Sequence, residues 1–113
     1  MLREVLAARV GGPGPDSHLE QRLYRLLAPL EPFEPHFQMV LEGVVVVVDA
    51  AWPWCRVAAE IDGRTYRVGS RSAFDRETRK LNLLATAGSS VAHLSATMSG
   101  EECFGAIRAL MPR

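Results

Sequence analysis

Residues 43–63 read GVVVVVDAAWPWCRVAAEIDG, two hydrophobic runs on either side of a Trp-Pro-Trp turn. Residues 44–50 are nearly continuous in β-branched side chains, the pattern of a strand buried on both faces, and residues 56–62 form a second such run. Acidic side chains at the ends of buried strands are costly unless a cation compensates them. The stretch therefore predicts two neighbouring strands with a candidate metal site formed by Asp49, Glu60 and Asp62.

The sequence before this stretch predicts helices and one more strand. Residues 2–10 are periodic enough for a short helix, and residues 11–16, GGPGPD, break the chain. Ser17 and Glu20 fit a capping box, which starts an amphipathic helix that ends at prolines 29, 32 and 35. Residues 36–41 alternate as a strand does, so Gly43 is expected in a hairpin turn.

The sequence after Gly63 predicts a helix, a strand and a last helix. Residues 73–87 are helical in pattern and stop at Gly88, residues 90–94 form a short strand, and Ser99 is a candidate cap for a helix over residues 100–111. The order of elements indicates an α/β layer structure. We expect an N-terminal helix and linker over residues 1–16 and one domain over residues 17–113.

Composition places the chain among ordinary globular proteins. It has 113 residues, 13 basic and 13 acidic, with a net charge of zero, and 48% of its residues are hydrophobic. The two cysteines, Cys55 and Cys103, form neither a metal-binding knuckle nor a disulfide framework, so both are expected as free thiols. The N-terminus lacks a signal-peptide core, and the valine run is too short to cross a bilayer. These features predict a cytoplasmic protein without a membrane partner.

Positive charge gathers between residues 64 and 80, although the whole chain is neutral. This segment carries six basic residues against Asp75 and Glu77. Either a solvated helix face or a phosphate-facing patch explains the surplus. As phosphate-binding candidates we take Arg64, Arg67, Arg76, Arg79 and Lys80.

The spacing of the carboxylates is compatible with one site. Alternate side chains of a strand share a face, so Glu60 and Asp62 project together, about 6.6 Å apart. Asp49 comes from the neighbouring strand, and the register of an antiparallel pair decides whether it reaches Glu60. Each carboxylate could also have a purely structural role: Asp49 could cap the turn, and the other two could face solvent on an edge strand.

Five motifs in order carry a resemblance to a known family. They are Ser17-x-x-Glu20, Val48-Asp49-Ala50-Ala51-Trp52-Pro53, Ala59-Glu60-Ile61-Asp62-Gly63, Asp75-Arg76-x-x-Arg79-x-x-x-Leu83, and Ala87-Gly88 before a strand. Over roughly residues 17–95 the chain resembles the uncharacterised domain family numbered 559. That family is grouped with very-short-patch-repair endonucleases in the PD-(D/E)xK superfamily.

The resemblance implies a restriction-endonuclease-like fold, a mixed β-sheet flanked by helices with an acidic site at one end. By position, it implies that Asp49 and Glu60 bind the metal ion, with Asp62 two residues further on and Glu20 as a helix carboxylate that completes some sites. Mg²⁺ or Mn²⁺ held there could activate a water and stabilise the leaving oxygen of a phosphodiester. The expected function is therefore a metal-dependent DNA endonuclease in repair, restriction or defence.

The chain also departs from the pattern. Asp62 stands where the superfamily has a lysine, and Tyr66 or Arg67 where a histidine is common; neither of these two titrates near neutral pH. Gly88-Ser89-Ser90 and His93 replace a Gly-Trp pair and a strand arginine. A catalytically degenerate domain that binds DNA or regulates a partner is therefore the alternative. It would work with a partner protein or a separate DNA-reading domain, and a homodimer through a hydrophobic strand edge is a third hypothesis.

Overall fold

The computed structural model describes residues 5–6, 15–30, 32–62, 71–95 and 97–112, and for residues 5, 15–20, 62 and 73 it describes the backbone only. The elements are, in chain order, β1 (Val5–Leu6), α1 (Pro15–Leu27), β2 (Glu34–Leu41), β3 (Val44–Trp52), the 3-10 helix η1 (Pro53–Cys55), β4 (Val57–Asp62), α2 (Arg71–Thr86), β5 (Ser90–Ser95) and α3 (Gly100–Leu110). The α/β class expected from the sequence is thus confirmed.

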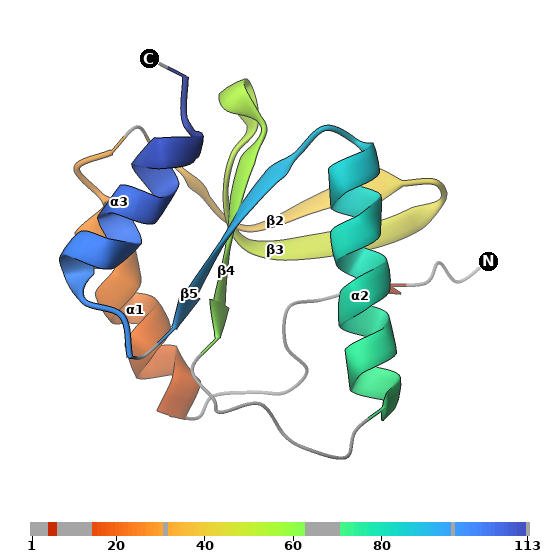
Figure 1. Ribbon diagram of the computed structural model, residues 1–113, viewed down its shortest axis with the longest axis horizontal. Coiled ribbons are helices and arrows are strands. Elements are labelled where there is room, and N and C mark those ends of the chain that lie inside the picture. The colour runs from red at the N-terminus through yellow and green to blue at the C-terminus, as the bar shows by residue number, and fades with distance from the viewer. Residues whose placement is uncertain (1–4, 7–14, 31, 63–70, 96, 113) are drawn as a thin grey trace.

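The strands form one mixed sheet. β2, β3 and β4 follow one another as antiparallel neighbours, whereas β5 pairs with β4 in parallel after the chain has crossed over through α2. Figure 1 shows α1 and α3 together on one side of the molecule and α2 on the other. None of the helices in the described part of the chain has the length and apolar character of a membrane span.

The N-terminal segment differs from the predicted helix. Val5 and Leu6 form a strand, β1, that pairs in parallel with Val45 and Val46 of β3. Leu6 is buried among the valines of β3. Tertiary pairing therefore overrides the helical periodicity of this short segment. Of the predicted Gly/Pro linker, residues 11–14 lie outside the described residues, and Pro15 and Asp16 already belong to α1, so the helix begins two residues before Ser17.

Local signals in the sequence predicted most of the other elements. Glu42 and Gly43 both have positive φ (51° and 78°) and close a two-residue hairpin between β2 and β3, as a type I′ turn requires. Ser99 caps α3 in a capping box with Glu102, whose amide donates to the serine hydroxyl over 3.1 Å. Cys55 and Cys103 are free thiols. These predictions are confirmed.

The sheet bends where His36 of β2 lies opposite Asp49 of β3. His36 has a φ of 48°, and the ladder between the two strands pairs residue 35 with 50 and residue 37 with 48 but skips this pair. Left-handed backbone in a non-glycine residue interrupts the regular pleat. Before the bend Val48 faces α2, and after it Ala50 faces α1 and α3.

Two hydrophobic cores result, one on each face of the sheet. The larger core joins α1 and α3 to the sheet and contains Trp52, which is fully buried. The smaller core joins α2 to the other face through Leu84 and the valines of β3. Burial of apolar surface on both faces accounts for the stability of a sheet this small.

Candidate active site

Asp49 lies at a fork where β4 separates from β3. The ladder between these strands ends at Ala50 and Ala59, so the next opposed positions are Asp49 and Glu60. At this point the carboxylate Oδ2 of Asp49 accepts a hydrogen bond of 2.7 Å from the backbone amide of Ile61. The Asp49 side chain therefore takes the place of a backbone acceptor at the end of the ladder. Asp49 is buried, with 3% of its surface exposed.

Tyr24 of α1 fixes the backbone of Asp49. Its hydroxyl donates a hydrogen bond of 2.7 Å to the Asp49 carbonyl, the strand position left without a ladder partner opposite His36. The tyrosine ring packs against Phe33 and lies edge-on to His36, with ring centroids 5.1 and 6.3 Å away. The bend in the sheet is thus tied to a helix, and Asp49 is held in one position.

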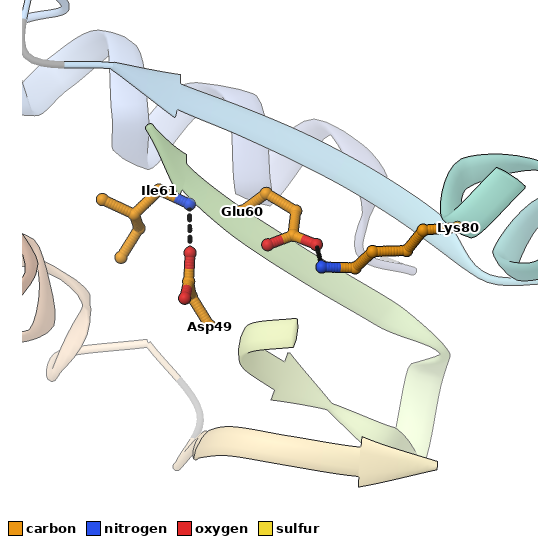
Figure 2. Close-up of polar contacts among 4 residues, drawn as sticks. All are labelled: Asp49, Glu60, Ile61 and Lys80. Carbon is orange, nitrogen blue, oxygen red and sulfur yellow. Dashed lines mark hydrogen bonds and ion pairs between the residues drawn. The ribbon is translucent and has the colours of Figure 1, made fainter. Parts of the chain in front are cut away.

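Glu60 of β4 forms an ion pair with Lys80 of α2. The Lys80 ammonium contacts Glu60 Oε1, and both residues are buried, with 1% of lysine and 4% of glutamate surface exposed. Figure 2 shows the Glu60 carboxylate turned toward Lys80 while the Asp49 carboxylate is turned toward the Ile61 amide. Three ionisable side chains from three elements therefore meet at the fork.

Burial dominates the electrostatics of Glu60. Loss of solvent raises its pKa from 4.5 to about 8; Lys80 opposes this rise, and the negative charges of Asp49 and Glu77 add to it. An acid whose pKa lies near neutral pH can exchange a proton under physiological conditions. The folded protein therefore contains a carboxyl group that titrates where an ordinary glutamate is fully ionised.

Glu77 is a member of this cluster that the sequence analysis did not single out. It lies one turn before Lys80 on the same face of α2, and its Oε2 atom is buried without a hydrogen-bond partner among the described residues. Glu60 Oε2 is in the same state. The i, i+3 spacing of Glu77 and Lys80 was a visible signal in the sequence, but it needed the contact with β4 to acquire meaning.

The structure places the other candidate residues in different surroundings. Arg76 and Arg79 are exposed on α2, as phosphate-binding residues must be, whereas the Lys80 ammonium is turned inward to Glu60. Glu20 lies on α1 and Asp62 at the end of β4, both with the backbone alone described. Arg64 and Arg67 lie outside the described residues.

The structure rules out the edge-strand alternative for Glu60, and it brings together only Asp49 and Glu60 of the described candidate metal ligands. β4 lies between β3 and β5, so Glu60 is not a solvent-facing residue of an edge strand. Within the described residues, no three histidine, cysteine or acidic side chains converge closely enough to hold a metal ion. A hollow of about 310 Å³ lies between α2 and the β2–β3 turn, lined by Glu42, Asp75 and Arg79 among others, and Glu60 is not part of its lining.

Comparison with protein-family models, with curated protein sequences and with solved structures found no match to this chain. Membership of family 559 and of its superfamily therefore stays a prediction from the motifs.

Proposed function

We propose that this domain hydrolyses phosphodiester bonds in DNA with a divalent cation held by Asp49 and Glu60. The observation that carries the proposal is the buried group of Asp49, Glu60 and Lys80 at the fork of β3 and β4. Buried charges are expensive, and a cluster with a strongly perturbed pKa is a candidate functional site.

The order of the elements supports a restriction-endonuclease-like fold. After α1 come three antiparallel strands, then α2 and a strand parallel to the last of the three. The resemblance implies a mixed sheet flanked by helices, with its two acids on neighbouring strands. Asp49 on β3 and Glu60 on β4 meet this expectation.

The residues at the fork fit a hard cation in type. Mg²⁺ and Mn²⁺ prefer carboxylate oxygens, and Glu60 Oε2 is a buried oxygen without a hydrogen-bond partner in the described part of the chain. Asp49 and Glu60 would hold the ion, and Glu77 is near enough to shift the pKa of Glu60. When bound, such an ion supplies a nucleophilic water and charge stabilisation for the leaving oxygen.

Lys80 could offset one departure from the superfamily pattern. Asp62 occupies the strand position where a lysine is usual, but Lys80 brings an ammonium group to Glu60 from α2. In this proposal Lys80 holds the Glu60 carboxylate in place and adds positive charge beside the site, where it stabilises negative charge that develops on a phosphate. Arg76 and Arg79, exposed on the same helix, bind the flanking phosphates.

The test is cleavage of a labelled DNA duplex and of a supercoiled plasmid in Mg²⁺ or Mn²⁺. We expect Asp49→Asn, Glu60→Gln and Lys80→Met each to lower the rate by about 100-fold or more. Glu34→Gln, at an exposed position of β2, is the matched control and should retain the wild-type rate. Equal rates in wild type and in the three site variants, or no cleavage in any of them, would refute the proposal.

A non-catalytic DNA-binding or regulatory domain is the second candidate, and one observation favours it. Both carboxylates already have structural partners, Asp49 in the Ile61 amide and Glu60 in Lys80. This candidate predicts no Mg²⁺ or Mn²⁺ binding in calorimetry, together with DNA binding that weakens in Arg76→Gln and Arg79→Gln. Metal binding that is lost in Asp49→Asn would contradict it.

A further inference from the structure

The outer face of α3 carries a stripe of four residues at positions i, i+3, i+4 and i+7. Glu101, Gly105 and Arg108 are exposed and Phe104 is half-buried, whereas Cys103 and Ile107 on the opposite face are fully buried. Residues at this spacing lie along one side of a helix. We call these four residues the α3 stripe.

The middle of the α3 stripe is apolar and open. A Cβ atom at Gly105 would meet nothing within 4 Å, so the backbone is bare at this point. The Phe104 ring lies beside it, and Leu26 of α1, 37% exposed, flanks it. A hollow of about 590 Å³ runs along this part of the surface, lined by Leu26, Ser99, Gly100, Glu101, Phe104 and Gly105.

The two ends of the α3 stripe carry opposite charges. Glu101 lies in the first turn of α3 and Arg108 in the last, about 10.5 Å apart along the axis. Neither forms an ion pair within the described part of the chain. The Arg108 guanidinium lies 5.7 Å from the centroid of the Phe104 ring, so it extends along the stripe.

This pattern is complementary to itself under a two-fold rotation. If two α3 helices pack antiparallel about a centre between residues 104 and 105, Glu101 of each copy faces Arg108 of the other. Phe104 of each copy then faces the bare backbone at Gly105. Isologous contacts of closed dimers require such self-complementarity.

We propose that the α3 stripe is the interface of a homodimer of this chain. A second copy satisfies both charged ends and fills the open centre. The contact uses the helical layer, whereas the hydrophobic strand edge is the site that the sequence suggested for a homodimer. The inference is independent of the proposed nuclease activity.

The experiment is sedimentation equilibrium on the full chain over a range of concentrations and at two salt concentrations. We expect a dimer that dissociates in roughly the micromolar range, because one helix pair buries a small area. Glu101→Arg and Arg108→Glu should each raise the dissociation constant at least tenfold, since each places two like-charged pairs in the contact. The double variant, Glu101→Arg with Arg108→Glu, should return it to within about threefold of wild type.

Two further variants separate the interface from the fold. Gly105→Gln fills the open centre while removing a glycine from a helix interior, so we expect a weaker dimer with an unchanged or higher Tm. Glu42→Lys reverses a charge in the β2–β3 turn, away from α3, and should dimerise as wild type does. A wild-type chain that stays monomeric would overturn the proposal. So would single charge reversals at Glu101 and Arg108 that dimerise as tightly as Glu42→Lys, or a double variant that does not regain the wild-type dissociation constant.

Discussion

The two faces of the sheet are built on different principles. On the face covered by α1 and α3, the core consists of twelve buried apolar residues, among them Trp52. On the face covered by α2, a smaller apolar core of seven buried residues lies next to the buried pair of Glu60 and Lys80. The same strands, β3 and β4, contribute to both faces.

The contrast separates the apolar packing that stabilises the domain from the buried Glu60–Lys80 pair, which we expect to contribute little to stability. Apolar burial drives folding, whereas a buried ion pair often contributes less than a hydrophobic pair of the same volume. Glu60 and Lys80 are therefore a poor choice for stability alone. Charged groups kept at such a cost are expected at functional sites.

The largest expected effect is the loss of stability when the core under α1 and α3 is truncated. Trp52→Ala removes a fully buried ring that packs 5.7 Å from Phe33, centroid to centroid, and should lower the free energy of unfolding by about 3–5 kcal/mol. Trp54, 58% exposed in the same turn, is the control, and Trp54→Ala should change it by no more than about 0.5 kcal/mol. Urea denaturation measures both. Similar losses in the two variants would contradict this account of the core.

The second prediction tests whether the α2 face is optimised for stability. Lys80→Met leaves Glu60 buried without its partner and, above pH 8 where Glu60 is ionised, should cost about 3–5 kcal/mol of unfolding free energy. The double variant Glu60→Leu with Lys80→Met should be as stable as wild type or about 1–4 kcal/mol more stable. Urea denaturation of the full cycle gives the coupling energy. A double variant clearly less stable than wild type would show that the pair stabilises the fold.

The third prediction concerns pH. The pKa of Glu60 is raised by burial to about 8, so between pH 4.5 and 8 the folded state holds a proton that the unfolded state has lost. The stabilisation from the protonated group is complete below pH 4.5 and is lost as pH rises through 8. The margin of wild type over Glu60→Gln in unfolding free energy should thus shrink with increasing pH, by about 1.4 kcal/mol per unit at most. If urea denaturation gives the same difference between wild type and Glu60→Gln from pH 5 to 8, the pKa of Glu60 is not raised and this account is wrong.

The smallest expected effect concerns the junction of the two faces. Tyr24→Phe removes the hydroxyl that bonds the Asp49 carbonyl but keeps the ring against Phe33. We expect a loss of about 0.5–1.5 kcal/mol in unfolding free energy, measured in urea. If the proposed function holds, cleavage should fall as well, because Asp49 loses one of its supports. If Tyr24→Phe matches wild type in both unfolding free energy and cleavage rate, the Tyr24 hydroxyl does not support Asp49.

Local signals made much of the fold predictable. The β-branched runs predicted β3 and β4, the Trp-Pro-Trp sequence predicted their turn, and Ser99 predicted the start of α3. The strand β1 was not predictable, because a two-residue strand depends on the neighbour it pairs with. Nor was the bend at His36, since the residue that adopts the left-handed conformation there is not a glycine.

For the candidate site, the sequence identified Asp49, Glu60 and Lys80 but not their relation. Asp49 and Glu60 are recognisable because a carboxylate stands out in a hydrophobic strand. Lys80 belongs to a run of basic residues, and periodicity alone does not show which of them faces the sheet. The i, i+3 spacing of Glu77 and Lys80 is visible in the sequence, but the part of Glu77 in the cluster comes from the packing of α2 over β4.

The sequence by itself determined the α/β class, the elements around the central hairpin and the two acidic positions, because propensity and hydrophobic periodicity are local properties. The tertiary structure alone decided the register that sets Asp49 opposite Glu60, the bend that changes the face of β3, and the Glu60–Lys80 pair. These depend on contacts between residues distant in the chain. Burial, which raises the pKa of Glu60 to about 8, likewise exists only once β4 and α2 have packed together.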